Sequence, residues 1–321
     1  MARDLPSACV AEGGAMIGPT EDVKERFLPS VDLLEAAMRA GKLALAGGRL
    51  DEALRHFNEA LRLKPEYDAA WLARGAAQRR MGDVEGALQS FAQALRFGRE
   101  SEEAWMGLAS ALRSLGRTKE EIEAYDELLK VHPRLVEAWI NKGAALHERR
   151  DYRGAISCYD RVLALRPEHA AAWNNKGAAL LRLGDEEAAL PCFDEALHFD
   201  PDFYDAMVNR ITILQKRGRH GETVLWADRA LRLRESALLW YVRGLAHLGL
   251  LEATAALQAF ERAIALDPGL EEARAGMKKA KDLRQRVDLY RGVYECFGTF
   301  EAGDPGCDEC EIRVRCREVT P

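Results

Sequence analysis

The sequence has no apolar run long enough to cross a membrane. No stretch of 18 apolar residues occurs in the chain, and a transmembrane helix needs about that many. Residues 1–27 also contain no apolar segment of signal-peptide length. We therefore expect a cytoplasmic protein, a compartment in which thiols stay reduced.

The chain also lacks a large excess of charge of either sign. It has 46 Lys and Arg against 52 Asp and Glu, a net charge of -6. Such a balance gives no general attraction to nucleic acid or to an anionic membrane. Apolar residues make up 48% of the chain, which is enough for a large core.

No motif of a known catalytic class is present. The chain contains no H-E-x-x-H, no G-x-S-x-G and no Gly-rich phosphate loop after a strand. Its seven histidines are scattered, and none lies beside a cysteine. We therefore predict that the protein is not an enzyme.

Cysteine is scarce until the C-terminal end. Only three of the seven cysteines precede residue 295. Two of these, Cys158 and Cys192, lie 34 residues apart on predicted helices. We expect them to be packed thiols, because no further metal ligands accompany them.

The other four cysteines form a C-x10-C-x2-C-x5-C motif, made by Cys296, Cys307, Cys310 and Cys316. Four thiolates suit a structural Zn²⁺ with a closed tetrahedral shell, and they also suit a four-cysteine iron–sulfur cluster. The motif is similar to the cluster ligands of some RecB-like nucleases, although the rest of that fold is absent from this chain. We predict a small metal-binding module at residues 293–321, in which the metal supplies folding energy. Zinc is the expected ion, and an iron–sulfur cluster is the alternative.

The body of the chain repeats itself every 34 residues. Large residues recur at this interval in Trp71, Trp105, Trp139 and Trp173, and Trp240 follows 67 residues later. A small residue follows four positions after each Trp, an aromatic follows twenty positions after it, and most units end in Pro. A turn glycine separates the two apolar stripes in most units, at Gly48, Gly82, Gly116, Gly184 and Gly218. This pattern predicts pairs of antiparallel helices, with glycine in the left-handed conformation between them.

On these residues the chain resembles the tetratricopeptide repeat (TPR) family over about residues 34–270. The resemblance implies an all-α fold, a right-handed solenoid of about seven helix-turn-helix repeats. We assign seven units: 34–67, 68–101, 102–135, 136–169, 170–203, 204–236 and 237–270. The first unit departs by having Ala37 in the Trp position, and the sixth has Met207 there and Ala227 in the aromatic position. We number repeat positions so that the Trp is position 4.

The regions outside the repeats complete the domain organisation. We read residues 1–30 as a tail that is disordered or helical from about Glu21, followed by the solenoid at 31–270. Residues 271–292 predict a polar helix that caps the solenoid. The cysteine-rich module then follows at 293–321.

The resemblance implies a concave groove lined by the first helix of each pair. Position 6 holds Asn141, Asn175 and Asn209 in three successive repeats. An Asn amide both donates and accepts, so it can bind a peptide backbone of any sequence. The row is similar to asparagine rows in peptide-gripping TPR proteins, including the repeat arm of O-linked N-acetylglucosamine transferase. The alternative is that Asn is merely common at this position of the family.

Charges at the two ends of the first helices predict the character of the partner. Positions 12 and 13 carry the cations Arg79, Arg80, Arg113 and Arg182, whereas position 2 carries the acids Glu35, Glu103, Glu137 and Asp205. A polarised groove would favour an acidic or mixed-charge segment in one orientation. The alternative is a set of solvated helix ends, because cations also suit a helix C-terminus. No repeat has the Lys and Asn pair of the chaperone-binding carboxylate clamp.

Position 7 is also cationic in five repeats, at Arg74, Lys142, Lys176, Arg210 and Arg243. We expect these side chains to bury their stems and expose their charged ends rather than to bind a ligand.

These observations predict an adaptor or scaffold that binds an extended peptide or partner protein in the concave groove. One alternative is contact with nucleic acid through the basic residues of 278–286 and the arginines Arg313, Arg315 and Arg317. The other is redox or iron sensing through the cysteine cluster.

Overall fold

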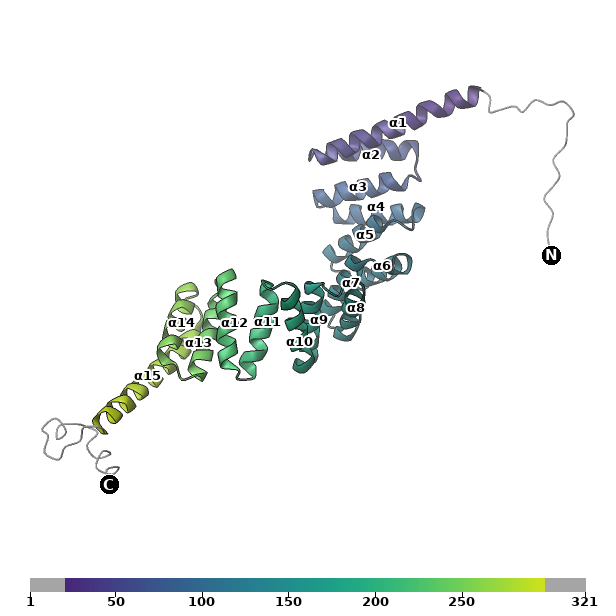
Figure 1. The fold of residues 1–321 in the computed structure, drawn as a ribbon. Coiled ribbons are helices and arrows are strands. Elements are labelled where there is room, and N and C mark those ends of the chain that lie inside the picture. The colour runs from purple at the N-terminus through teal and green to yellow at the C-terminus, as the bar shows by residue number, and fades with distance from the viewer. Residues whose placement is uncertain (1–20, 298–321) are drawn as a thin grey trace, which may run out of the picture. The chain divides into compact units, whose positions relative to one another are not determined.

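The computed structural model describes the backbone of residues 21–297 and the side chains of residues 32–287. Every regular element in this range is an α-helix, and the range contains no strand (Figure 1). The described helices fall into two compact units, which we call unit 1 (up to Ala145) and unit 2 (from Leu146). The prediction of an all-α repeat protein is therefore confirmed.

The helices alternate between the first and second members of seven pairs. The first helices are α1 (Glu21–Ala46), α3 (Asp68–Met81), α5 (Glu102–Ser114), α7 (Val136–Glu148), α9 (Ala170–Leu183), α11 (Tyr204–Lys216) and α13 (Ala237–Gly249). The second helices are α2 (Leu50–Leu63), α4 (Val84–Phe97), α6 (Thr118–Val131), α8 (Tyr152–Leu165), α10 (Glu186–Phe199), α12 (His220–Leu233) and α14 (Ala253–Leu266). A last helix, α15 (Glu271–Phe297), follows the seventh pair.

The turn inside each pair has the backbone conformation that its glycine predicts. All five turn glycines have positive φ, between 68° at Gly218 and 84° at Gly184. In the other two described turns with positive φ, Arg150 (63°) and Leu251 (62°) occupy the same position. The turn therefore has the same conformation in the two repeats that lack the glycine. In those repeats Arg150 and Leu251 adopt a left-handed backbone, which is strained for a residue with a side chain.

Consecutive repeats are held together by an aromatic ring between two first helices. A Cβ atom on Gly75 of α3 would lie 2.8 Å from Phe91 Cε1, and one on Gly107 of α5 would lie 2.6 Å from the same atom. The ring of Phe91 on α4 therefore contacts the backbones of the helices on both sides. This contact explains why small residues recur in the sequence, since a larger side chain would push the helices apart.

Helix α15 packs as the first helix of an incomplete eighth repeat. Its Gly276 lies against Phe260 of α14 as Gly107 lies against Phe91, and Ala273 and Ala280 are buried in the same core cluster. Arg274 stands at position 4 and donates to the carbonyl of Pro268. The tryptophans of four repeats make the equivalent bond six residues back, as Trp71 does to Pro65 O at 2.8 Å. Most other described side chains of α15 are exposed and polar, and α15 is the last of the described helices.

The cap is longer than the sequence predicted, because α15 continues to Phe297 rather than to residue 292. Gly292 weakens a helix but does not stop one, and no proline occurs between Pro268 and Pro305. Cys296 therefore lies on the last turn of α15, although its side chain is outside the described residues. Cys307, Cys310 and Cys316 also lie outside them, as do residues 1–20 of the predicted tail. Within the described range, no helix combines the length and apolarity that a bilayer crossing needs.

Candidate functional site: the first-helix surfaces of the two units

Unit 1 carries a hollow of about 500 Å³ on its first helices, which we call the unit 1 groove. Its lining residues are Leu72, Ala76, Arg79, Phe91, Glu103, Met106, Gly107, Ser110, Arg113, Tyr125 and Asn141. Three predicted site residues, Arg79, Arg113 and Asn141, therefore come together from α3, α5 and α7. The predicted acid Glu103 lines the same groove, so both charged ends of α5 contribute to it.

The floor of the unit 1 groove is apolar. Gly107 stands at position 6, where the next three repeats have Asn. With no side chain there, the groove reaches the ring of Phe91 below, and Leu72 and Met106 line it. The groove can therefore receive an apolar side chain between polar groups at its rim. We did not predict this apolar floor, although Gly107 was visible in the asparagine column.

Arg113 is held in place from below by a buried carboxylate. Its Nε donates to Glu121 Oε1 at 2.7 Å, and its Nη2 donates to Tyr125 Oη at 3.3 Å. Glu121 is fully buried at a repeat position where most units have Ala. Burial raises the pKa of Tyr125 to about 12, so its hydroxyl is neutral at ordinary pH. The side chain of Arg113 keeps 42% of its surface exposed, so it faces the groove in a fixed orientation.

Arg80 has a different role from its neighbour Arg79. Its Nη1 donates to the carbonyl of Leu45 at 2.6 Å, near the end of α1. The same carbonyl accepts from the backbone N–H of Gly48 at 3.2 Å, so Arg80 adds a second hydrogen bond at the end of the helix. Arg80 is not among the residues that line the unit 1 groove. Arg79 lines the groove with an exposed side chain.

In unit 2 the predicted asparagines are linked by a third amide. Asn209 Nδ2 on α11 donates to Asn174 Oδ1 on α9 at 3.0 Å, and Asn174 Nδ2 donates to Asn175 Oδ1 at 3.4 Å. Asn174 is buried, with 7% of its surface exposed. We call Asn174, Asn175 and Asn209 the unit 2 amide row. Asn174 was missed because position 5 is apolar in most repeats.

The predicted cation Arg182 lies at the exposed C-terminal turn of α9. Burial, together with the positive charge of Arg182, lowers the pKa of His147. The His147 ring packs edge-on against Tyr152, with centroids 5.1 Å apart. At this edge of unit 2 an arginine and a neutral histidine are therefore neighbours.

The cations at position 7 join neighbouring repeats. Each of four pairs with an aspartate on the preceding second helix, in the pairs Lys142–Asp126 (2.5 Å), Lys176–Asp160 (2.7 Å), Arg210–Asp194 (2.6 Å) and Arg243–Asp228 (2.6 Å). Several also lie over the tryptophan three residues back, as Lys176 does over Trp173 at 5.4 Å. The partner aspartates form their own column, one residue after the aromatic position, which we did not predict.

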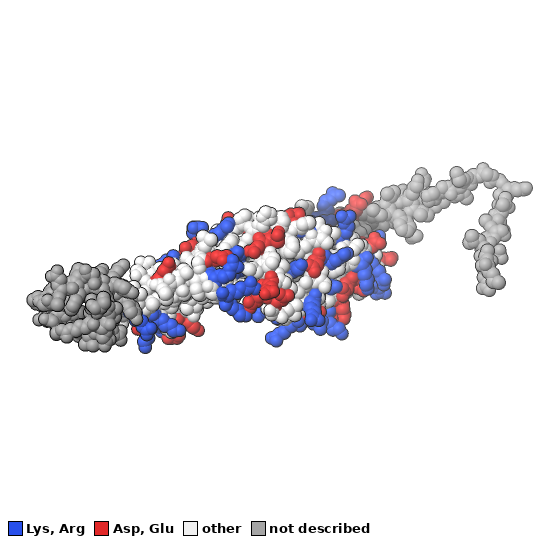
Figure 2. All heavy atoms as spheres, turned by 60° about the horizontal axis from the view of Figure 1, so that its bottom comes forward, with Lys and Arg blue, Asp and Glu red and all other residues white. Residues whose placement is uncertain are grey.

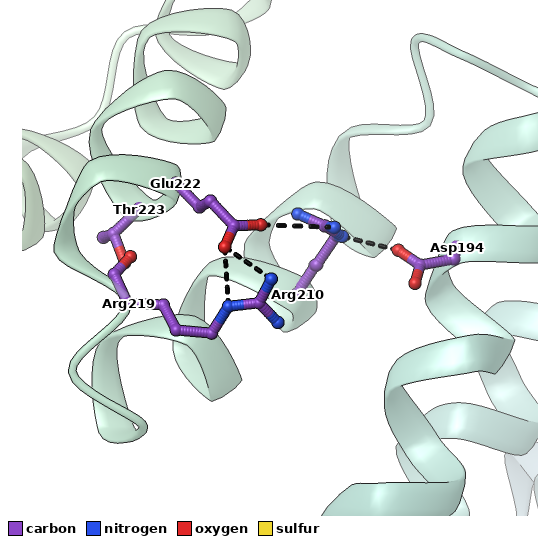
Figure 3. Close-up of polar contacts among 5 residues, drawn as sticks. All are labelled: Asp194, Arg210, Arg219, Glu222 and Thr223. Carbon is purple, nitrogen blue, oxygen red and sulfur yellow. Dashed lines mark hydrogen bonds and ion pairs between the residues drawn. The ribbon is translucent and has the colours of Figure 1, made fainter.

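Figure 3 shows that the ion pairs around Arg210 involve several charged side chains. Its guanidinium lies between Asp194 of α10 and Glu222 of α12, and Arg219 also donates to Glu222. Only 12% of the Arg210 side chain is exposed. These arginines and carboxylates hold three helices together, so we assign them to the repeat interface and not to a ligand site.

Other surfaces give little indication of a ligand. On the face that Figure 2 shows, cationic and anionic side chains are interspersed without a large area of one sign. Among the described residues, no group of three His, Cys, Asp or Glu side chains could hold a metal ion. Cys158 and Cys192 are buried, and burial raises the pKa of the Cys192 thiol.

Comparisons with known proteins point to the same architecture. A family model described as Tetratricopeptide repeat matches residues 38–102, 77–135 and 140–203, slightly more than half of the chain. No curated protein matches the chain.

Solved structures are similar at low sequence identity. A tetratricopeptide repeat protein from Parabacteroides merdae is 20% identical, with 78% of this chain and 99% of that one covered and a TM-score of 0.55. The C-terminal part of a TPR repeat-containing protein from Cytophaga hutchinsonii is 14% identical, covering 75% and 99%, with a TM-score of 0.64. PilF from Pseudomonas aeruginosa is 19% identical, covering 65% and 95%, with a TM-score of 0.55. At such identities the likeness concerns the fold.

Proposed function

Because the chain belongs to the tetratricopeptide repeat family, we propose that it is a protein-interaction scaffold that binds an extended segment of a partner protein on its first helices. The family generally serves binding rather than catalysis. The proposal assigns the unit 1 groove and the unit 2 amide row as two binding surfaces.

The observation that carries the proposal is the composition of the unit 1 groove. An apolar floor in a hollow of about 500 Å³ is surrounded by a few polar groups from three helices, and a ligand site has this composition. Arg113 is already oriented by Glu121, so binding would not have to order it. A partner with an apolar side chain next to an acidic one would suit this surface, with the acid toward Arg79 and Arg113.

Site-specific photo-cross-linking tests the proposal. A photoreactive residue in place of Met106, in the groove, is expected to cross-link to a partner in cells of the source organism. The matched control is the same residue in place of Gln89, which is exposed on the second helix α4. The product at 106 should be lost when Arg79→Glu is added, because the substitution reverses the charge of the rim. Equal cross-linking from both positions, or a product that survives Arg79→Glu, would contradict groove binding.

A second candidate is nucleic-acid contact through α15, favoured by the basic side chains of Lys278, Lys279 and Lys281 on its polar surface. Its test is binding to a labelled duplex by the wild type and by a variant with all three lysines changed to Gln. Salt-sensitive binding that the variant loses would support this function. Equal binding by the two proteins, or no binding by either, would exclude it.

A further inference from the structure

We infer that Asn174 is a positioning residue, which orients Asn175 and Asn209 so that the unit 2 amide row binds the backbone of an extended peptide in a set pattern of donor and acceptor. This inference rests on the proposed function and names the chemistry of one of its two surfaces. It does not involve the unit 1 groove.

An amide at position 5 carries a free-energy cost unless it is hydrogen-bonded. Position 5 holds Leu72, Met106 and Ile140 in the three preceding repeats, so the site readily accepts an apolar side chain. A primary amide that is 7% exposed is unfavourable there unless its polar atoms are bonded. Asn174 meets that requirement by accepting from Asn209 and donating to Asn175. An apolar residue would hold the helices together without these bonds.

The two bonds of Asn174 orient the amides of Asn175 and Asn209. Asn209 directs its Nδ2 toward Asn174, so its Oδ1 is turned to the opposite side of the amide. Asn175 directs its Oδ1 toward Asn174, so its Nδ2 is the group turned away. The row therefore presents a donor on α9 and an acceptor on α11. Asn174 thereby couples the two outer amides, so that one presents a donor when the other presents an acceptor; without Asn174, each could rotate by half a turn independently.

The oriented amides match the chemistry of a peptide backbone. A donor and an acceptor on neighbouring helices match the C=O and N–H groups of a peptide backbone, which recur along a chain whatever its side chains are. In a helical segment those groups are already bonded to each other. The segment must therefore be extended to use the row. Asn141 is not part of this arrangement, because position 5 of its own repeat is Ile140.

The test needs a probe that uses this row. Random 12-residue peptides are selected for binding to the wild-type chain and counter-selected against the double variant Asn175→Ala/Asn209→Ala. The affinity of the best peptide is then measured for the wild type, Asn174→Leu and Asn174→Asp. Leu copies the residue of repeat 2, so the fold should be kept, and a urea unfolding curve checks this. Asp keeps an acceptor for Asn209.

We expect Asn174→Leu to weaken binding about fivefold, since one well-oriented hydrogen bond has about that worth. N-methylation along the peptide should locate one amide whose loss weakens binding to the wild type and to Asn174→Asp but not to Asn174→Leu. A merely structural role for Asn174 would not produce this dependence. Equal affinity of Asn174→Leu and the wild type would overturn the inference, while a selection that yields no peptide dependent on Asn175 and Asn209 would overturn the proposed function of this surface.

A measurement without any ligand tests the orientation directly. The side-chain NH₂ of Asn209 should exchange its hydrogens slowly in NMR spectra of the wild type and of Asn174→Asp, because it donates to residue 174 in both. It should exchange quickly in Asn174→Leu. Fast exchange in the wild type would refute the positioning role of Asn174 whatever the peptide experiments give.

Discussion

Ile211 and Ala227 face each other in the sixth repeat with their sizes reversed relative to the other repeats. In the other repeats a small residue on the first helix packs against an aromatic ring on the second helix, as Gly177 packs against Phe193. In the sixth repeat the large side chain, Ile211, is on the first helix and the small one, Ala227, is on the second. Both are buried in the same core cluster, with 1% and 0% of their surface exposed. The volume between the helices is therefore kept although both residues depart from the pattern.

This exchange predicts strong coupling between the two positions. Ile211→Ala alone should lower the free energy of unfolding by about 3 kcal/mol through the cavity it leaves, and Ala227→Tyr alone should destabilise by overpacking. The double variant copies Ala109 and Tyr125 of the third repeat and should be more stable than the sum of the single changes implies. Urea unfolding of all four proteins measures the coupling. Strictly additive effects would mean that the two side chains do not share a volume.

Leu251 predicts a stabilising substitution. It has a φ of 62° at the turn position that is Gly in five repeats, and a left-handed backbone costs a residue with a side chain about 1–2 kcal/mol. Leu251→Gly should raise the free energy of unfolding by about 1 kcal/mol, because the greater flexibility of Gly in the unfolded chain offsets part of the gain.

The matched control for Leu251→Gly is the reverse change, Gly184→Leu. Gly184 has a φ of 84°, and a Cβ atom added to it would have no other atom within 4 Å, so only backbone strain should act there. Gly184→Leu should lower the free energy of unfolding by a similar amount. A destabilising Leu251→Gly would show that the exposed side chain makes an interaction that outweighs the strain.

His247 predicts a second stabilising change, Ala259→Ser. Its Nδ1 lies 2.6 Å from Glu252 Oε2, while its Nε2 is buried and has no partner among the described residues. In repeat 2 the equivalent Gln78 bonds to Asp83 and also accepts from Ser90. Ala259 occupies the position of Ser90. A serine there should donate to His247 Nε2 and add about 1 kcal/mol to the free energy of unfolding.

Ala124→Ser is the control for this prediction. Ala124 is buried at the same repeat position, but Leu112 stands where His247 would be, so the new hydroxyl would have no such acceptor and should destabilise. Thermal or urea unfolding compares the two variants with the wild type. The same sign of change in both would show that the effect does not depend on His247.

His147 predicts a loss of stability in acid. Burial and the nearby Arg182 lower its pKa in the folded chain, whereas in the unfolded chain it has the ordinary value of about 6.5. Below that value the unfolded state binds a proton before the folded state does, so the free energy of unfolding falls as pH decreases. His147→Gln should lose less stability between pH 7 and pH 5 than the wild type. Gln is chosen because Gln215 holds the same repeat position.

Urea unfolding at both pH values measures the difference, and His198→Gln, at an exposed histidine, is the control. If His147→Gln loses as much stability as the wild type, His147 does not contribute to the pH dependence.

The cysteine motif predicts a bound metal. Elemental analysis of protein made without a metal-affinity tag should find one zinc ion per chain, and Cys307→Ser/Cys310→Ser should lose it, since thiolates hold such ions. Iron together with visible absorption would identify the alternative iron–sulfur cluster. The Cys158→Ser variant should keep the metal. A metal-free wild type would rule out the module.

The repeat pattern made much of the fold predictable. The 34-residue spacing of Trp71, Trp105, Trp139 and Trp173 placed the helix pairs, and Gly82 and Gly184 placed their turns. Such features are local, because helix periodicity, turn conformation and the match of large to small residues are encoded within one unit. Repeat position likewise placed Arg79, Arg113 and Asn141 on first helices, and all three line the unit 1 groove.

Contacts between side chains of different elements were harder to foresee. The sequence alone did not reveal that Glu121 holds Arg113, that Arg80 bonds the end of α1, or that Asn174 joins two other amides. Each of these bonds depends on which rotamer reaches across to a neighbouring group. The repeat position of a residue indicates which face of the helix its side chain lies on. It does not indicate which neighbouring group a long side chain will hydrogen-bond.

The architecture follows from the order of residues within each repeat, which specifies the helix pairs, their turns, and the columns of residues that face one another. Which polar groups in those columns remain available for binding depends on the three-dimensional packing of the helices. The cations at position 7 form ion pairs between repeats, as Arg210 does with Asp194, whereas Arg79 and Arg113 line the unit 1 groove. The physical reason is that stacking depends on volume and periodicity, which a repeat displays in one dimension, whereas the pairing of charges and amides depends on distances in three.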